Sequence, residues 1–501
     1  MHFGWFDVIT TAHLASIVIG AACGVIGGAI PGLSSAGTLA LMLPVVLNVS
    51  PLAAIIVLSS AYTGAQYGGS ITATLFNTPG APESAVMTID GFALSSAGLG
   101  RKALVGALWA GLIGGLLGVL VLIFFAPWLA TQALYFGPPE FTALAILGLT
   151  VMASLGKGSV IKGFFAGSLG MLISAVGIDP IGGEPRLTFG TSELLGGIPL
   201  IPALIGLFAI SESLRLVSSR IGDGVTRLSV QQKSSFTWKD FIGTIRYVLV
   251  GSIVGVFVGV KPGGGATIAS WLAYSAARGV APPEERKRFG SGAMGGLLAP
   301  EAADKATVGA ALIPLLSLGI PDSASGAVIL GAFQLHDLLP GPMLFSNSPE
   351  LVHGLFVSLI LANVAVLFIG RMLIEPLLKI RSLDTGLLAL GILVISTLGA
   401  YAYGGSVWDV VVAALIGVLG FALHVSQVPL APVVLGMVIG PLFEVNLRRS
   451  LIMSDGSWGI FASRPTALAL LAASVAFLVI PVGLRIVSRA RSMATHGGTD
   501  V

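Results

Sequence analysis

The sequence predicts an all-α polytopic membrane protein with about 12 transmembrane or re-entrant segments in two related halves. Only 10% of its 501 residues are charged, and its mean hydropathy is +0.96. Soluble domains carry about a quarter charged residues. The apolar runs are continuous rather than alternating, which favours helices over a barrel. Pro-Gly pairs interrupt these runs in both halves.

Uncharged stretches mark the predicted spans. No Asp, Glu, Lys or Arg occurs between Asp7 and Glu83, and residues 103–126, 385–408 and 465–484 are equally free of charge. Each of these three runs is close to the ~20 residues that a helix needs to cross the hydrocarbon core. The chain lacks the basic start of a signal peptide, so its first apolar stretch is predicted to be a retained span.

Charge distribution predicts the organisation of the chain. We expect an N-terminal membrane half at residues 1–214, a cytoplasmic linker at residues 215–246 and a C-terminal half at residues 247–501. The linker is basic, as the positive-inside rule requires of cytoplasmic loops. Residues 177–193 are more acidic and are expected outside. The net charge of +3 fits basic loops and does not indicate nucleic-acid binding.

Four Pro-containing breaks interrupt the apolar segments, at residues 31–32, 79–80, 262–265 and 320–323. Proline lacks an N–H and glycine permits positive φ, and irregular backbone at membrane depth must be buried or line a cavity. Secondary transporters pair such broken helices around a midplane site, where helix N-termini attract carboxylates. Each break by itself is equally compatible with an ordinary kink. Two breaks in each half favour a transport site.

Residues at these breaks are the predicted substrate ligands, mainly through backbone N–H groups. Lys261 either attracts an anionic substrate or extends to a lipid headgroup. The predicted substrate-binding residues are Pro31, Gly32, Ser34, Ser35, Asn77, Thr78, Pro79, Gly80, Lys261, Pro262, Gly263, Gly264, Gly265, Ala266, Thr267, Pro321 and Ser323.

Charged residues inside the second half are the candidates for ion coupling. These are Glu301, Asp304, Lys305 and Asp322. In a helix, Glu301 and Lys305 have the i,i+4 spacing of an ion pair, which leaves Asp304 free to titrate or to bind a cation. The alternative is a neutralised cluster at an interface. No metal site is predicted with certainty.

Motifs for other functions are absent from the sequence. The six His residues lack metal-ligand spacing, and there is no phosphate-binding loop or Gly-x-Ser-x-Gly elbow. We therefore predict no enzyme, no ATP-driven pump and no cofactor; a carboxylate in a transport pathway could carry H⁺ or bind Na⁺ as a coupling ion. A passive anion channel and, less well supported, a membrane-embedded enzyme remain as alternatives.

The motifs in their order resemble the large membrane subunit of the tripartite tricarboxylate transporters, the TctA-type permeases. The likeness covers nearly the whole chain. It is carried by Tyr67-Gly68-Gly69-Ser70-Ile71-Thr72-Ala73, Asn77-Thr78-Pro79-Gly80, Pro262-Gly263-Gly264-Gly265-Ala266, Ala299-Pro300-Glu301-Ala302-Ala303, Leu318-Gly319-Ile320-Pro321 and Glu444-Val445-Asn446-Leu447-Arg448-Arg449-Ser450.

The resemblance implies uptake of di- and tricarboxylates across the bacterial inner membrane, driven by an ion gradient. It implies two partners besides the lipid bilayer, a periplasmic substrate-binding protein and a small membrane subunit. This chain has Asp304-Lys305 where the family usually has Asn-Asn, and Asp322 where Gly is usual. Lys261 likewise stands where an uncharged residue is common.

Overall fold

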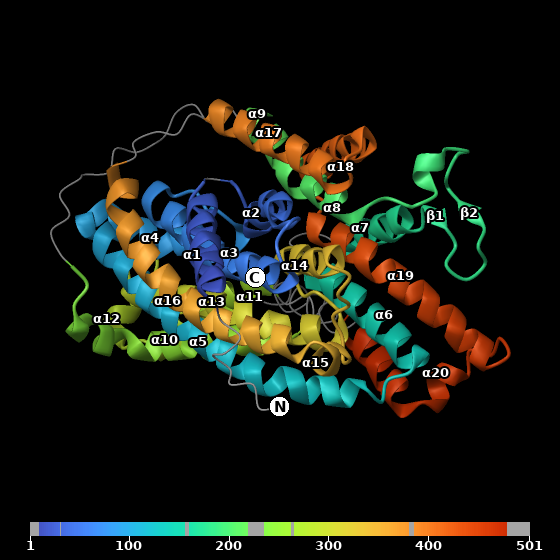
Figure 1. Cartoon of the computed structure of the whole chain (residues 1–501). Coiled ribbons are helices and arrows are strands. Elements are labelled where there is room, and N and C mark those ends of the chain that lie inside the picture. The colour runs from blue at the N-terminus through green and yellow to red at the C-terminus, as the bar shows by residue number, and fades with distance from the viewer. Residues whose placement is uncertain are drawn as a thin grey trace, which may run out of the picture. The chain divides into compact units, whose positions relative to one another are not determined.

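The computed structural model describes residues 10–30, 32–155, 160–218, 235–261, 265–379 and 385–477 (Figure 1). These residues are helical almost throughout. The strands among them are β1 (Gly177–Ile178) and β2 (Pro185–Arg186), which pair antiparallel with Gly177 opposite Arg186. The predicted all-α fold class is therefore confirmed.

The chain folds into two compact units. Unit 1 comprises Met1–Leu134 and Pro199–Ser426, and unit 2 comprises Tyr135–Ile198 and Gln427–Val501. Each unit takes segments from both predicted halves of the sequence. The predicted halves are based on sequence repetition, not on packing. Their bounds, residues 1–214 and 247–501 with a linker at 215–246, stay a prediction.

Unit 1 holds most of the helices. The longer ones are α1 (Thr11–Gly28), α2 (Ser35–Met42), α3 (Pro51–Phe76), α4 (Met87–Leu94), α5 (Gly100–Ala133), α9 (Ser211–Ser218), α10 (Trp238–Gly259), α11 (Gly265–Val280), α13 (Met294–Leu318), α14 (Ala324–Leu335), α16 (Pro349–Lys379), α17 (Thr385–Gly404) and α18 (Val407–Val425). The short elements are η1 (Leu43–Val46), η2 (Pro82–Ser84), η3 (Ser95–Leu99), α8 (Leu200–Leu204), η5 (Ile205–Ile210), α12 (Pro283–Arg286) and α15 (Leu344–Asn347).

Unit 2 is smaller. It contains α6 (Pro138–Leu155), α7 (Val160–Ser174), the β1–β2 hairpin, η4 (Ser192–Leu194), α19 (Leu430–Met453) and α20 (Ile460–Ser463). Helix α19 packs against both α6 and α7. The hairpin follows α7 directly and lies within the acidic stretch that the sequence predicts to be outside.

Apolar helices of membrane-spanning length dominate the described residues. Eight helices there are long and apolar enough to cross a membrane, and four shorter helices are also apolar. The eight are Thr11–Gly28, Met87–Ala133, Leu200–Ser218, Trp238–Gly259, Pro349–Leu377, Gly386–Gly404, Val407–Val425 and Leu430–Met453. The chain is a multi-pass membrane protein.

Two other long helices, α3 and α13, lie at the core of unit 1. Every residue of α3 from Ala54 to Leu75 is buried, and so is every residue of α13 from Gly295 to Leu318. Both helices carry polar side chains within these stretches. Because they are surrounded by protein rather than lipid, polar groups can be held at depth there.

Glycines bring α1 close to α3. Gly20, Gly24 and Gly28 recur every fourth residue on one face of α1. A Cβ built at Gly24 would lie 2.2 Å from the carbonyl oxygen of Ala61 on α3. No larger residue fits at that step, so the backbones of the two helices are in direct contact.

The same packing recurs between α10 and α13. Gly251 and Gly255 of α10 face the backbone of α13, and a Cβ at Gly255 would lie 2.3 Å from the carbonyl oxygen of Ala303. Gly28 of α1 and Gly259 of α10 each precede the proline of the following Pro-Gly break by three residues. The pair α1–α3 in the first half thus has a counterpart in α10–α13.

Candidate substrate and ion site

The first break joins α1 to α2. Gly32 has a φ of +88°, which glycine adopts without strain; Pro31 lies outside the described residues. Ser34 caps α2, since its hydroxyl accepts a hydrogen bond of 3.1 Å from Gly37 N. The cap satisfies one of the four N–H groups that a helix start leaves without an intrahelical partner.

The second break ends α3. Asn77 takes a left-handed conformation with φ of +54°, and both Asn77 and Thr78 are exposed. Pro79 is partly buried and Gly80 is buried. A Cβ at Gly80 would lie 2.7 Å from the carbonyl oxygen of Gly28, so this break packs against the end of α1.

The third break precedes α11. Lys261 is exposed, while Pro262, Gly263 and Gly264 lie outside the described residues. Gly265 begins α11 with a φ of +58°, and of the next two residues Ala266 is buried and Thr267 partly so. Helix α11 packs against η2, the turn that follows the second break.

The fourth break ends α13. Gly319 caps the helix in the left-handed conformation with φ of +71°, two residues before Pro321, just as Asn77 stands two residues before Pro79. Pro321 is buried. Ser323 caps α14, and its hydroxyl accepts a hydrogen bond of 3.1 Å from Gly326 N.

Ser35 links three of these breaks. Its hydroxyl donates a hydrogen bond of 2.7 Å to Oε1 of Glu83 in η2, and it accepts one of 3.1 Å from the Ser325 hydroxyl in the first turn of α14. All three side chains are buried. A helix N-terminus carries a partial positive charge, so the carboxylate of Glu83 stands where anions are favoured. The sequence singled out Ser35 and the position of Glu83 beside the second break, but not Ser325.

Three charged residues of α13 are fully enclosed. Glu301 and Asp304 are 0% exposed and Lys305 is 2% exposed. The predicted ion pair between Glu301 and Lys305 is wrong. Glu301 Oε2 instead accepts from the hydroxyl of Ser70, and Lys305 Nζ donates to the carbonyl oxygen of Thr63. Both partners lie on α3. The side chains of Glu301 and Lys305 therefore bond to this neighbouring helix and not to each other.

Several buried polar atoms of this core have no hydrogen-bond partner within the described residues. They include Oε1 of Glu301, both carboxylate oxygens of Asp304, Oδ1 of Asp322 and both amide atoms of Gln66. Residues 63, 66 and 70 lie along one face of α3, so Gln66 stands between the contacts to Lys305 and Glu301. Buried polar groups are ordinarily paired, and a group of unpaired ones is typical of a site that binds ions, protons or water.

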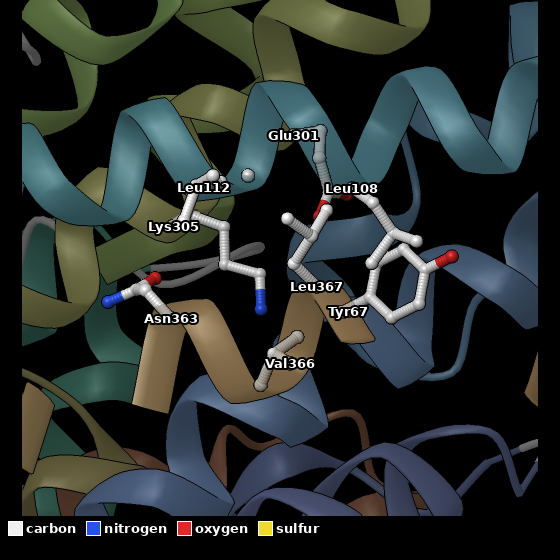
Figure 2. Close-up of a pocket in the computed structure, with 9 residues that line it drawn as sticks. Tyr67, Leu108, Leu112, Glu301, Lys305, Asn363, Val366 and Leu367 are labelled. Carbon is white, nitrogen blue, oxygen red and sulfur yellow. The ribbon is translucent and has the colours of Figure 1, made fainter. Parts of the chain in front are cut away.

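A small cavity lies next to Glu301 and Lys305 (Figure 2). Its volume of ≈ 10 Å³ is about that of one water molecule. Glu301 and Lys305 project into it from α13, and Tyr67 and Asn363 line it from α3 and α16. Gly111 of α5 makes the space, because a Cβ there would lie 3.2 Å from Oε1 of Glu301.

Arg215 also reaches the first break, although the sequence placed it in a solvated linker. Its Nη2 donates a hydrogen bond of 3.1 Å to the carbonyl oxygen of Gly32, and its Nε donates one of 2.9 Å to Glu212. Both side chains belong to α9. A basic residue at the start of a basic segment gave no sign of this contact, which depends on how α9 packs.

Asp90 serves as a structural acceptor. Its carboxylate accepts hydrogen bonds from the backbone N–H groups of Gly292 and Ala293, at 2.7 and 2.9 Å, and from the Tyr274 hydroxyl at 2.9 Å. The residue is 0% exposed. It thus ties α4 to the loop before α13 and to α11, and it has no oxygen left for a ligand.

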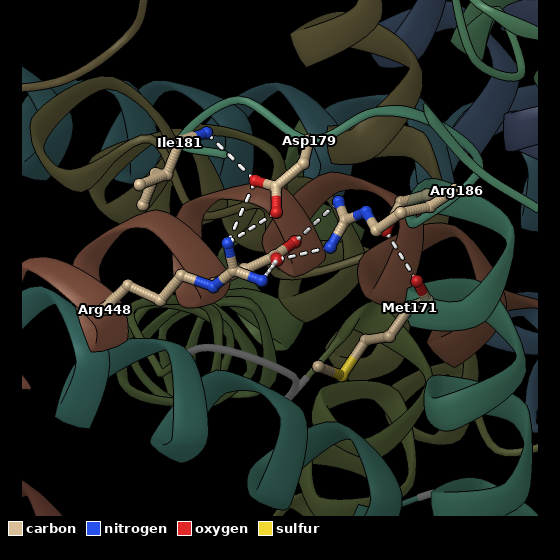
Figure 3. A network of polar contacts seen from close by, with 7 residues as sticks. Met171, Asp179, Ile181, Arg186 and Arg448 are labelled. Atoms are coloured by element: carbon tan, nitrogen blue, oxygen red, sulfur yellow. Dashed lines mark hydrogen bonds and ion pairs between the residues drawn. The ribbon is translucent and has the colours of Figure 1, made fainter. Parts of the chain in front are cut away.

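Unit 2 contains a separate ionic network beside a cavity of ≈ 270 Å³ (Figure 3). Arg186 and Arg448 share Glu444, at 2.5 and 2.8 Å, and Arg448 also holds Asp179 at 2.7 Å. The hydrogen bonds from Arg448 and from the backbone of Ile181 hold the pKa of Asp179 well below its usual range. Two cations balance two carboxylates, so the network fastens the hairpin to α19 rather than offering a charged site.

Comparisons with known proteins agree with the family suggested by the motifs. A family model described as the tripartite tricarboxylate transporter TctA family matches residues 14–435. An Agrobacterium vitis protein named "Uncharacterized 52.8 kDa protein in TAR-I ttuC' 3'region" is 36% identical over 483 residues, which are 96% of this chain and 95% of that protein.

A second Agrobacterium vitis protein, "Uncharacterized protein in TAR-II ttuC' 3'region", is 33% identical over 226 residues, which are 45% of this chain and 93% of that protein. No solved structure matches the chain significantly. The family model and the first relative both cover most of the sequence. The chain therefore belongs to the tripartite tricarboxylate transporter TctA family.

Proposed function

We propose that this protein is the permease of a binding-protein-dependent secondary transporter that takes up organic anions, di- or tricarboxylates or related carboxylates, across the bacterial inner membrane. A gradient of Na⁺ or H⁺ drives the uptake. A periplasmic binding protein delivers the substrate, and a small membrane subunit completes the transporter. Membership of a transporter family supports transport rather than catalysis as the function.

The convergence of three breaks on Ser35 carries this proposal. The N-termini of α2 and α14 approach each other there, and the buried carboxylate of Glu83 already lies beside the first of them. Free N–H groups and helix dipoles at such a place stabilise carboxylates. The N–H groups at the starts of α2 and α11 are the proposed substrate donors, with Ser34, Ser35, Thr267 and Ser323 as secondary ligands and Lys261 as the attracting charge.

Uptake by intact bacteria tests the proposal. The chain is expressed with its binding protein and small membrane subunit, and labelled citrate and succinate are supplied separately as probes. We expect at least one probe to accumulate above its outside concentration and to leak out when ionophores collapse the ion gradients. Equilibration without accumulation would instead identify a passive anion channel.

A substitution links the transport to the site. Lys261→Ala removes an exposed positive charge, and we expect it to raise the apparent KM for the accumulated anion more than it lowers the maximal rate. Lys239→Ala, which removes an exposed lysine from the start of α10, is the matched control. Equal kinetics for both variants would show that Lys261 only faces the lipid headgroups.

A further inference from the structure

The core of unit 1 encloses more negative than positive charge. The charged groups that act on Asp304 are Glu83, Glu301 and Lys305. Glu83 is 9% exposed, and the others are almost completely buried. Among the three fully enclosed groups alone, two carboxylates, Glu301 and Asp304, stand against one ammonium, Lys305, so the cluster would be negative if all were ionised. Uncompensated charge is costly at membrane depth, so this cluster needs a further proton or cation.

Asp304 is the acid of the cluster for which the described part of the chain offers no hydrogen-bond donor. Glu301 accepts a hydrogen bond from Ser70, and Glu83 accepts one from Ser35. Neither carboxylate oxygen of Asp304 has a hydrogen-bond donor within the described residues. A protonated Asp304 would bury a neutral group, whereas an ionised one would bury an unpaired charge. The side chain is therefore the most suitable proton acceptor of the three.

Lys305 beside it is held in place. Its ammonium donates to the carbonyl oxygen of Thr63 and lies 5.9 Å from the centre of the Tyr67 ring. The side chain points into the cavity next to Glu301 (Figure 2). A fixed positive charge close to Asp304 disfavours its protonated form, which makes the proton easier to release.

The surroundings favour a proton over a metal ion. The cavity beside Glu301 and Lys305 has a volume of ≈ 10 Å³, which holds about one water molecule and is too small for a hydrated cation. No group of three or more His, Cys, Asp or Glu side chains in the described part of the chain is arranged to hold a metal ion. The buried ammonium of Lys305 also repels a second cation from this part of the core.

Several other charged groups on the elements around α13 have partners away from Asp304, and Lys239 of α10 and Arg278 of α11 lie at the exposed ends of their helices. The described ion pairs and hydrogen bonds join Lys102 of α5 to Asp240, Arg101 of α5 to Glu375, Arg246 of α10 to Glu285, and Tyr274 of α11 to Asp90. Asp322, just before α14, is buried near Tyr62, which also lies close to Asp304. Like Glu301 and Asp304, it has a carboxylate oxygen without a hydrogen-bond partner among the described residues, and it enters the test below.

We propose that Asp304 carries the coupling proton of this transporter, with Lys305 as the positioning charge that sets when the proton is released. The inference rests on the proposed transport function. A hydronium ion outside transfers its proton to a carboxylate oxygen of Asp304, which leaves water and a neutral acid. On the inner side the same O–H bond breaks, and the proton passes to water.

Substrate-induced proton movement tests the inference. Lightly buffered cells that express the complete transporter, in medium free of Na⁺, receive whichever probe anion is transported, citrate or succinate. We expect the medium to become alkaline as the anion enters. With Asp304→Asn, we expect net uptake and proton entry to fall by roughly tenfold or more. Exchange of labelled for unlabelled anion, which needs no net proton movement, should fall much less.

Matched variants separate proton coupling from general damage. Asp409→Asn makes the same change at a buried carboxylate of α18, outside the cluster, and should keep the proton entry of the wild type. In Asp322→Asn, the medium should still become alkaline during uptake. If alkalinisation is lost in Asp322→Asn but kept in Asp304→Asn, Asp322 carries the proton and the proposal is overturned. If Asp304→Asn reduces the amount of protein in the membrane, the proposal is tested instead by two other results: whether protons enter with the anion in the wild type, and how the lysine variants change the pH profile.

Lys305 is tested by the pH profile. Removing the positive charge in Lys305→Met favours the protonated form of Asp304, so we expect the pH dependence of uptake to move upward by about one unit. Lys305→Arg should restore the profile. An unshifted profile in Lys305→Met would refute the role of the lysine.

The results of these experiments distinguish failure of the proton-coupling inference from failure of the proposed transport function on which it rests. Anion exchange without proton entry, or uptake that strictly requires Na⁺, would overturn the proton proposal and leave the transporter intact. No exchange of either anion, with the partners present, would contradict the proposed function and remove the basis of the inference.

Discussion

The hydroxyl of Ser35 lies 2.7 Å from Oε1 of Glu83 and donates a hydrogen bond to it. The two residues belong to the segments that follow the first and second breaks. Their contact joins the start of α2 to η2, and Ser325 extends it to α14. A single hydroxyl thus connects three segments that follow Pro-containing breaks. The sequence showed that the breaks resemble one another, but not that these segments are in contact.

Loss of this hydroxyl should impair transport. In Ser35→Ala, the Glu83 carboxylate loses a donor inside the protein, which costs about 1.5–3 kcal/mol for a hydrogen bond to a charged group. We expect a lower thermal midpoint in detergent and slower anion uptake. Ser16→Ala removes an exposed hydroxyl on α1 that bonds only its own helix, and it should change neither measurement. Equal thermal midpoints and equal uptake rates in the two variants would show that the Ser35 hydroxyl supports neither stability nor transport.

The contact between α10 and α13 depends on glycine. A Cβ at Gly255 would overlap the carbonyl of Ala303, so Gly255→Ala should force the helices apart and destabilise unit 1 by about 1–3 kcal/mol. Gly243→Ala on the same helix meets nothing within 4 Å and should be neutral or slightly stabilising. Thermal unfolding of the purified protein measures both. Equal stability would show that the helices do not approach this closely.

Asp90 should be essential for stability. Asp90→Asn puts an amide where three backbone N–H groups and the Tyr274 hydroxyl all donate, and an unpaired buried donor costs about 1–3 kcal/mol. We expect markedly less folded protein in the membrane and a lower thermal midpoint. Asp337→Asn is the control, because Asn tolerates the positive φ of +55° there. A wild-type midpoint for Asp90→Asn would refute the assignment.

The Asp179–Arg448 pair should make the hairpin of unit 2 resistant to acid. Because the pKa of Asp179 is lowered in the folded protein, the stabilisation is fully present above the ordinary Asp value of about 3.9 and is lost only as the pH falls through the lower folded value. The wild-type hairpin should thus stay attached at mildly acidic pH. Arg448→Gln removes this protection.

Limited proteolysis between residues 177 and 198 measures the attachment. We expect cleavage in Arg448→Gln at pH values where the wild type is resistant. Arg464→Gln, which breaks the weaker pair with Glu140 at 3.4 Å elsewhere in unit 2, should leave the hairpin protected. Cleavage of the wild type at neutral pH would contradict the ionic attachment.

Much of the architecture followed from local pattern. Low charge and continuous apolar runs predicted helices of membrane-spanning length, and the Pro-Gly positions predicted where helices end. The structure ends α3 at Asn77 and α13 at Gly319 with the same left-handed conformation. Helix length and helix ends depend on a few residues that are neighbours in sequence. They can therefore be predicted from the sequence alone.

The candidate site was predicted less completely. Ser34 and Ser323 were chosen as ligands, and the structure shows that they cap α2 and α14. The expected pair of Glu301 and Lys305 is replaced by separate bonds to α3. Spacing along one helix says which side chains are able to meet, but it does not say which groups a neighbouring helix offers.

The sequence by itself determined that this is a helical membrane protein of a known transporter family, with breaks at defined residues, because hydrophobicity, proline and glycine act over short distances. Only the tertiary structure decided that Ser35 meets Glu83 and Ser325, that Arg215 reaches Gly32, and that no described residue donates a hydrogen bond to Asp304. These outcomes arise from the close packing of helices distant in sequence, where each buried polar group must find whatever donor or acceptor lies next to it.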